Sequence, residues 1–175
     1  MTLICPDCGA ENIAGVDTCE SCGQSLTMLN KPQRSPSPVG DGMLRDQIKA
    51  LNPKHPITTS PETPLENVLR IMLENRIGSI LITEEERLVG IFSECDAVNR
   101  VGVEFNSLRG QPISDFMTPM PGTLEAENKI IFAVHKMAIG GYRHVPIVEG
   151  DQPVGVISIR DILCYAEETI GGAST

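Results

Sequence analysis

The sequence contains no tryptophan and only six aromatic side chains among 175 residues, so an aliphatic core is expected. It contains no run of about 18 uncharged apolar residues, which argues against a membrane-spanning helix. The first residues, MTLICPDCG, lack the basic and apolar regions of a secretory signal peptide. We therefore expect a cytoplasmic protein with no membrane association.

Lysine and arginine are absent from residues 1–29, which carry four carboxylates, and the whole chain has a net charge of −9. Nucleic-acid affinity depends largely on cations that neutralise phosphates, so this composition argues against a nucleic-acid partner. Catalytic patterns are missing too, since there is no Ser/His/Asp ordering, no paired-carboxylate motif and no P-loop. We therefore expect a protein that is not an enzyme.

Four of the six cysteines form two CxxC pairs that are ten residues apart, in CPDCGAENIAGVDTCESCG. Glycine follows each second cysteine, which suits a tight turn, and this spacing resembles a zinc ribbon. Four thiolates in tetrahedral array suit structural Zn²⁺ best and leave no open position for catalysis. A rubredoxin-like iron site for electron transfer and two disulfides in an exported protein remain alternatives. The expected ligands are Cys5, Cys8, Cys19 and Cys22.

Composition and repetition divide the chain into segments. Residues 30–44, NKPQRSPSPVGDGML, hold three prolines and two glycines, which predicts an extended, mobile linker. Beyond it, residues 48–100 align with 113–165 without a gap, and eleven of the 53 columns are identical. The expected divisions are a zinc ribbon (1–29), the linker (30–44), a first repeat (45–109), a second repeat (110–170) and a tail (171–175).

Each repeat is expected to have the order strand, helix, strand, strand, helix, so the predicted class is α+β with the two copies packed as a pseudo-two-fold pair. In the first copy, Thr63 is the expected N-cap of a helix, with Pro64 and Glu66 completing a capping box. Its expected apolar stripe is Leu65, Val68, Leu69, Met72 and Leu73. The following strands are expected at 79–83 and 88–92, and a second helix at Ser93. The second copy is expected to have a helix at 128–141, strands at 144–148 and 154–158, and a helix at 159–168.

The two repeats end in GIFSECD (90–96) and GVISIRD (155–161), which share Gly, Ser and Asp. A serine followed three residues later by an acidic residue is a helix cap, which contributes about 1 kcal/mol. The same place is also an anion site, because free N–H groups point outward from a helix start. A serine hydroxyl there suits a phosphate, and an aspartate one turn later suits the paired hydroxyls of a ribose.

The element order, together with DFMTPMPGTLEAENKI, RHVPIV and GVISIRD, resembles the cystathionine-beta-synthase (CBS) domain, and two in tandem resemble a Bateman module over residues 45–168. The resemblance implies binding of AMP, ADP, ATP or S-adenosylmethionine and assembly into a homodimer. It implies ribose contacts from Asp96 and Asp161 and phosphate contacts from Ser93 and Ser158. It also implies an adenine pocket near Thr58, Thr123, Ile82 and Ile147.

The two implied sites differ in charge. Arg143 and His144 precede the VPIV strand, whereas their counterparts 65 residues earlier are Gly78 and Ser79. We therefore predict a tighter site for a phosphorylated ligand around Asp161, Ser158 and Arg143, with His144 beside it. A surface salt bridge is the alternative for the arginine. The resulting hypothesis is a cytoplasmic regulatory protein that senses an adenine nucleotide and meets a protein partner through its zinc ribbon. The alternatives are a zinc-ribbon nucleic-acid-binding regulator and a rubredoxin-like redox protein.

Overall fold

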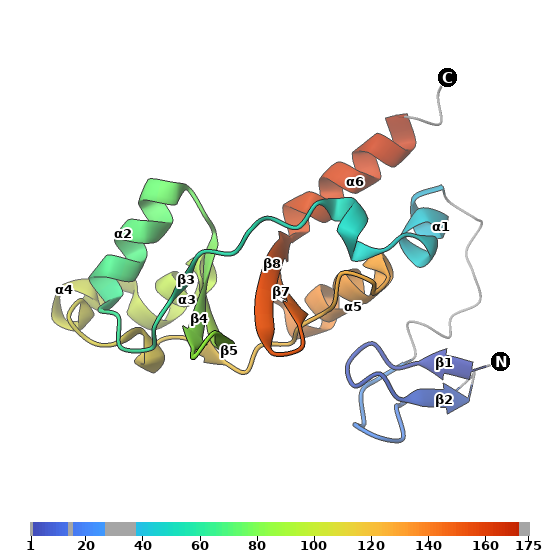
Figure 1. Ribbon diagram of the computed structural model, residues 1–175, viewed down its shortest axis with the longest axis horizontal. Helices are drawn as coiled ribbons and strands as arrows, with labels where there is room; N and C mark the ends of the chain where they lie inside the picture. The colour runs from blue at the N-terminus through green and yellow to red at the C-terminus, as the bar shows by residue number, and fades with distance from the viewer. Residues whose placement is uncertain (1, 14–15, 27–37, 172–175) are drawn as a thin grey trace.

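The computed structural model describes residues 2–13, 16–26 and 38–171. Figure 1 shows a small N-terminal hairpin beside two α+β units, whose central strands lie next to each other. The expected α+β class with two related units is confirmed. Within the described ranges, no helix combines the length and apolar character needed to cross a bilayer.

The N-terminal hairpin joins β1 (Thr2–Ile4) and β2 (Glu11–Ile13) in an antiparallel pair. Its buried apolar centre consists of Cys5, Cys19 and Leu26. A centre this small buries little apolar surface, so the cysteines are expected to contribute most of the stability of this segment. We call residues 2–13 and 16–26 the four-cysteine module.

The linker prediction is wrong for residues 38–44, which lie in α1 (Pro38–Arg45). Residues 30–37 lie outside the described part of the chain. The helix packs on the C-terminal unit, since Gly42 is buried and a Cβ there would lie 2.4 Å from the Tyr165 hydroxyl. That hydroxyl donates to Asp46, just after the helix, at 2.6 Å. Tertiary packing therefore overrides the poor helix propensity of two glycines.

The first repeat contains β3 (Thr58–Thr59), α2 (Leu65–Asn75), β4 (Ser79–Glu84) and β5 (Arg87–Ser93). Strand β3 is parallel to β4, and β4 is antiparallel to β5. The expected stripe of α2 is partly wrong, because Leu73 is 79% exposed. At 100° per residue, Leu73 lies about 80° away from Leu65, and the inward face is instead centred on Leu65, Val68 and Met72.

The capping box at Thr63 is wrong. The N-cap of α2 is Pro64, without a side-chain cap, and the Thr63 hydroxyl instead lies 2.7 Å from that of Thr59. The first N–H groups of the helix donate to the segment that leads into the second repeat: Leu65 to the carbonyl of Gln111 at 2.9 Å and Glu66 to that of Arg109 at 3.0 Å. A side-chain cap is therefore not needed.

The helix expected at Ser93 begins there but is broken. Residues Glu94–Asp96 form α3, a π turn follows at Ala97–Val101 (η2), and a 3-10 turn follows at Gly102–Glu104 (η3). Gly102 has a φ of +48°, which a helix interior does not accept. The short α4 (Phe105–Leu108) and the 3-10 turn Ile113–Asp115 (η4) then lead into the second repeat.

The second repeat contains α5 (Ile130–Gly140), β7 (His144–Glu149), β8 (Gln152–Ser158) and α6 (Ile159–Gly171). Its first strand is reduced to a single parallel bridge between Leu124 and Ile147. This bridge corresponds, 65 residues on, to the pairing of Thr59 with Ile82 in the first repeat. Two buried clusters of mainly aliphatic residues are centred on the two repeats. Each also takes in residues that open the other repeat: Ile48 and Leu51 in one, and Ile113 and Phe116 in the other.

The opening segment of each repeat pairs with the other repeat. Strand β6 (Thr118–Pro119), near the start of the second repeat, is antiparallel to β5 of the first. Reciprocally, Lys54 exchanges two backbone hydrogen bonds of 3.1 and 3.0 Å with Val156 of β8. The 3-10 turn Ile48–Leu51 (η1) precedes this second crossing. Residues of one repeat are thereby brought to the end of the other repeat's last strand.

The glycine that opens each shared motif allows this crossing. A Cβ on Gly155 would lie 2.8 Å from Cβ of Pro53, and one on Gly90 would lie 2.3 Å from Sδ of Met117. Real Cβ atoms do not approach this closely, so a side chain at 155 would push the segment at Pro53 away, and one at 90 would displace the Met117 side chain.

Candidate functional site

The Ser and Asp of each motif bind one another where a strand passes into a helix. At the end of β8, the Ser158 amide and hydroxyl donate to Oδ2 of Asp161 at 2.6 and 2.7 Å. At the end of β5, Ser93 makes the same two bonds to Oδ2 of Asp96 at 2.9 and 2.6 Å, and the full capping box is present. In both pairs Oδ1 is left to face other groups.

A cavity of about 270 Å³ lies beside Ser158 and Asp161, and we call it the Asp161 cavity. This volume is close to the lower limit of small-molecule sites, about 300 Å³. Its walls come from the segment leading into the first repeat, the α2–β4 junction, the start of β7 and the β8–α6 junction. The lining residues are Lys54, His55, Ile57, Arg76, Ile77, Gly78, Ser79, Glu94, Arg143, His144 and Val156 to Asp161.

The Asp161 cavity has an excess of positive charge. Its walls carry four cations and two carboxylates. The cations are Lys54, Arg76, Arg143 and Arg160, and the carboxylates are Glu94 and Asp161. The Lys54 ammonium lies 3.9 Å from Oδ1 of Asp161, and the Lys54 side chain is largely exposed. An exposed pair of this length is weak, so Oδ1 remains open to a ligand hydroxyl.

A second cavity, of about 280 Å³, lies beside Ser93, and we call it the Ser93 cavity. Its lining is Ile91, Ser93, Cys95, Thr118, Met120, Pro121, Gly122, Gly140, Gly141, Tyr142, Arg143 and His144. Asp96 is not part of the lining. Its Oδ1 accepts a hydrogen bond from Thr118 at 3.2 Å and pairs with Arg100 at 3.3 Å. The aspartate of this motif is therefore already engaged within the protein.

Arg143 and His144 line both cavities. Burial lowers the pKa of His144 below its ordinary value of 6.5, against the opposing effect of Glu94 and Asp161. The imidazole is therefore neutral at pH 7, and Arg143 is the group at this position that carries a positive charge. Because Arg143 faces both cavities, its charge alone does not explain why one cavity should bind a phosphorylated ligand more tightly than the other.

The four residues expected around an adenine line neither cavity. Ile82 and Ile147 are fully buried in the cores of their repeats. Thr58 pairs with Leu81 in the β3–β4 ladder, and Thr123 faces the four-cysteine module. The side chains with apolar surface that line the cavities include Ile57 and Ile77 in one and Pro121 and Tyr142 in the other.

Three cations of the Asp161 cavity were missed by sequence reasoning. Their counterparts at the 65-residue offset are uncharged: Pro119 for Lys54, Gly141 for Arg76 and Cys95 for Arg160. Comparing the charges of residues 65 positions apart would have found these three cations. No feature of the sequence indicates the backbone pairing that brings Lys54 to Asp161.

The four cysteine sulfurs of the module lie within 4.8 Å of one another. The Cys5 and Cys22 sulfurs are 3.7 Å apart, and those of Cys8 and Cys19 are 3.6 Å apart. Tetrahedral Zn–S bonds of about 2.3 Å place sulfurs about 3.8 Å apart, so the geometry fits a tetrahedral metal ion. Among the causes that act on Cys19, the backbone amide of Cys22 is the largest, and the pKa of this thiol falls to about 6. A thiolate at neutral pH suits metal binding. By contrast, burial raises the pKa of the Cys5 thiol, and the pKa of Cys22 is raised to about 12. A bound cation would therefore be needed to keep all four sulfurs as thiolates.

Both CxxC turns have the geometry expected of metal knuckles. The Gly9 amide donates to the Cys5 carbonyl and the Gly23 amide to the Cys19 carbonyl, each at 2.9 Å. Both glycines have a positive φ, of 72° and 74°. Asn12 donates to Sγ of Cys19 at 3.5 Å, which orients a ligand sulfur from outside the cluster.

The chain belongs to the CBS domain family, since the family model matches residues 48–102 and 113–168. The CBS domain-containing protein CBSCBSPB1 of Arabidopsis thaliana is 28% identical over 130 residues, which cover 74% of this chain and 24% of that protein. The match therefore spans about a quarter of that relative's length. The protein YlbB of Bacillus subtilis is 30% identical over 112 residues, which cover 61% of this chain and 74% of that protein.

Solved CBS structures share the fold of the two repeats. The CBS domain protein PAE2072 from Pyrobaculum aerophilum, complexed with AMP, matches with a TM-score of 0.60 and 24% identity, covering 70% of this chain and 98% of that one. The four-cysteine module lies outside the residues that the family model matches.

Proposed function

We propose that this chain is a regulatory protein, not an enzyme, whose CBS pair senses an adenosine-containing nucleotide, AMP, ADP, ATP or S-adenosylmethionine. The observation that carries the proposal is the Asp161 cavity, where a rigidly held aspartate and a serine stand among four cations. The carboxylate suits a ribose and the cations suit a phosphate, which Ser158 would join by turning its hydroxyl away from Asp161. The AMP complex of PAE2072 supports the same ligand class.

We propose that the two cavities differ in affinity, with the Asp161 cavity the tighter one for a phosphorylated ligand. Its charge excess favours an anion, whereas among the described residues Arg143 is the one lysine or arginine that lines the Ser93 cavity. In addition, Asp96 would have to give up Arg100 or Thr118 before its Oδ1 could bind a ribose. Breaking such a pair costs part of the binding free energy.

We propose that the four-cysteine module holds a structural Zn²⁺ ion through Cys5, Cys8, Cys19 and Cys22 and offers a surface to a protein partner. The sulfur separations support zinc, and the acidic sequence of residues 1–29, which contains no lysine or arginine, supports a protein rather than a nucleic-acid partner. Metal analysis of protein purified without added metal tests this: zinc supports it, and iron would favour the redox alternative.

We propose that the protein acts in the cytoplasm as a homodimer formed through the CBS pair. Val98 and Leu163 occupy equivalent positions of the two repeats, and their side chains are 71% and 63% exposed. Each repeat therefore exposes an apolar side chain at the same position, and such a pair suits a symmetric contact with a second copy of the chain. Light scattering on the full chain should give the mass of two chains, and the mass of one would refute the dimer.

Calorimetry with AMP, ADP, ATP, S-adenosylmethionine and NADH tests the ligand class. We expect at least one adenosine compound to bind the metal-loaded protein. Arg143→Met should weaken the phosphorylated ligands more than S-adenosylmethionine, because it removes a cation without touching the Ser–Asp pairs. Arg45→Met, which alters an exposed arginine outside both cavities, is the control. Absence of binding by all five compounds would refute the proposal.

A further inference from the structure

Lys136 is a buried lysine whose ion-pair partner belongs to the four-cysteine module. Its side chain is 5% exposed, and its ammonium lies 3.0 Å from Oδ1 of Asp7. Asp7 stands in the turn between Cys5 and Cys8, and its side chain is 51% exposed. The pair therefore joins a lysine inside the second repeat to a carboxylate on the surface of the module.

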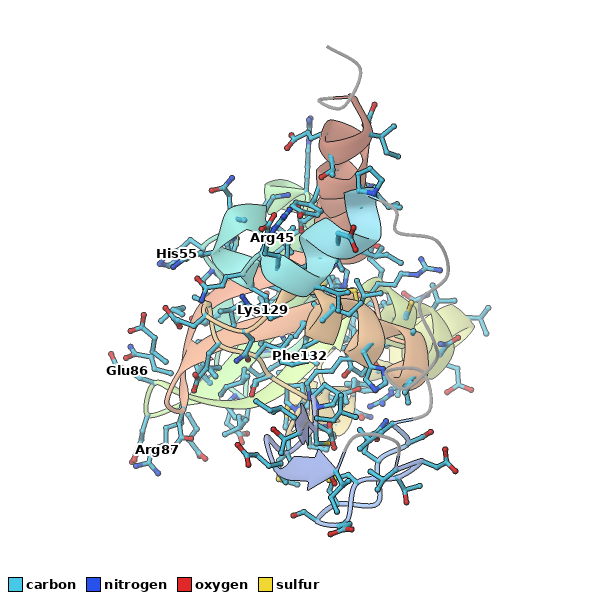
Figure 2. All side chains as sticks on the ribbon, turned by 90° about the vertical axis from the view of Figure 1, so that its right-hand side faces the viewer. Arg45, His55, Glu86, Arg87, Lys129 and Phe132 are labelled. Carbon is cyan, nitrogen blue, oxygen red and sulfur yellow. The ribbon has the colours of Figure 1, made fainter. Side chains whose placement is uncertain are left out.

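The contact continues along a groove of about 350 Å³ between the module and the second repeat. Ile4 and Asp7 form part of one wall, and Thr123 and Phe132 form part of the other. Figure 2 labels Phe132 on the side of α5 that faces the β1–β2 hairpin, and Figure 1 shows this hairpin next to α5.

The Lys136 ammonium also lies directly behind the wall of the Ser93 cavity. A Cβ on Gly122 would be 3.4 Å from Nζ of Lys136 and 3.1 Å from the Tyr142 hydroxyl. Gly122 and Tyr142 both line that cavity. Burial, and then the charge of Asp7, raise the pKa of Tyr142, which places the carboxylate close to the same wall.

Separation of the module from the repeat would break this ion pair, which is largely buried on its lysine side in the docked state. Breaking a hydrogen-bonded charge pair costs free energy, so the docked state is favoured until another anion takes the place of Asp7. The Ser93 cavity is where such an anion would arrive, since the Arg143 guanidinium lines it and offers further donors.

We propose that the Asp7–Lys136 ion pair docks the four-cysteine module on the second repeat, and that a phosphate-bearing ligand in the Ser93 cavity displaces Asp7 and releases the module. The docking part stands on the ion pair and the groove. The release part rests on the proposed nucleotide binding. The ligand acts as a switch because it binds the released state better than the docked state.

The docking part is tested by ¹⁵N relaxation of the module's backbone amides in the metal-loaded full chain. In the wild type without ligand, these amides should tumble with the CBS pair. Asp7→Asn should make them tumble independently, whereas Asp17→Asn, at an exposed acidic position of the same module, should leave them docked. Identical relaxation in wild type and Asp7→Asn would overturn the docking role.

The release part is tested by adding AMP or adenosine to the same samples, with binding followed by calorimetry. AMP should release the module in the wild type, whereas adenosine, which lacks the phosphate, should leave it docked. Because coupling between two equilibria is reciprocal, Asp7→Asn should bind AMP in the Ser93 cavity, the weaker of the two sites, about 5-fold or more tightly than the wild type, with the affinity of the Asp161 cavity unchanged. AMP binding that leaves both the relaxation and the Asp7→Asn affinity unchanged would overturn the release.

The two proposals can fail separately. If calorimetry detects no AMP binding in any variant, nucleotide sensing by AMP and the release step fail together. The docking role would still be decided by Asp7→Asn in the absence of ligand.

Discussion

The carboxylates of Asp96 and Asp161 are each fixed by the serine three residues earlier, through an amide and a hydroxyl. One oxygen of each is used to start a helix. The other oxygen of Asp161 faces the cavity near Lys54, whereas that of Asp96 is engaged by Thr118 and Arg100. A ligand that meets Asp161 therefore finds an acceptor whose rotamer is already set, which lowers the entropy cost of binding. The helix-cap interpretation and the ligand-site interpretation describe two oxygens of the same group.

At the same scale, His135 is a buried histidine on α5 whose Nε2 has no hydrogen-bond partner in the described part of the chain. Burial, and then Lys136, lower its pKa below the ordinary value of 6.5. The unfolded chain therefore binds a proton at a higher pH than the folded one, and stability falls as the pH drops below about 6.5. His135→Leu should reduce this slope by up to about 1.4 kcal/mol per pH unit.

Urea unfolding at pH 7.5, 6.5 and 5.5 measures this effect. His55→Gln, at an exposed histidine, is the matched control and should keep the wild-type slope. The free energy of unfolding of each variant is compared with that of the wild type at the same pH, so that any loss of metal in acid affects both equally and cancels. A slope that does not change in His135→Leu would show that this imidazole is not the acid-sensitive group.

The sequence alone predicted which motif residues belong to the site, but it predicted only some of the residues that surround them. Ser158 and Asp161 are three residues apart, and their hydrogen bonds follow from local geometry alone. Lys54 reaches Asp161 because the segment leading into the first repeat pairs with the second, a contact between residues about 100 positions apart. No local pattern encodes that pairing.

Among the elements, the strands and long helices followed closely from periodicity and the repeat. The strand expected at 144–148 is β7 (His144–Glu149), and the helix expected at 128–141 is α5 (Ile130–Gly140). Errors occurred where a partner from elsewhere in the chain decided the structure. Carbonyls at 109 and 111 replace the expected cap of α2, and packing on Tyr165 forms α1 in a segment expected to be a linker.

The packing of α1 gives a prediction at this scale. Gly42→Ala would place a Cβ 2.4 Å from the Tyr165 hydroxyl and push it away from Asp46. The loss of a hydrogen bond to a carboxylate should lower the free energy of unfolding by about 1.5–3 kcal/mol. Thermal and urea unfolding measure the change. Gly110→Ala, where a Cβ meets nothing within 4 Å, should be nearly neutral, and equal effects of the two variants would contradict the packing of α1.

At the scale of the whole molecule, the CBS pair has two aliphatic cores, whereas the four-cysteine module has almost none. Metal binding should therefore supply most of the folding free energy of the module, on the order of 10 kcal/mol. Chelation should abolish hydrogen-exchange protection of amides such as Cys5, Gly9, Cys19 and Gly23, and readdition of zinc should restore it. Protection in the strands β4, β5, β7 and β8 should persist. Protected module amides in metal-free protein would contradict this account.

The crossing of the two leading segments makes the repeats a single unit and places the candidate ligand cavities between them. A ligand in the Asp161 cavity touches both repeats, since Lys54 and Gly78 come from the first and Ser158 from the second. Binding is therefore suited to change how the repeats sit together, and through them the surface shown to a partner. Sequence repetition predicted the pair, but the charge difference between the cavities became clear only from the assembled walls.

The most direct measurement is the calorimetric dissociation constant of whichever adenosine nucleotide binds most tightly, compared between wild type, Asp161→Ala and Asp96→Ala. Loss of a charged hydrogen bond of about 1.5–3 kcal/mol should weaken binding by about 10- to 150-fold in Asp161→Ala. Asp96→Ala should have a smaller effect on the tight site, because Asp96 lines neither cavity. Unchanged affinity in Asp161→Ala, or a larger loss in Asp96→Ala, would contradict the assignment of the Asp161 cavity as the nucleotide site.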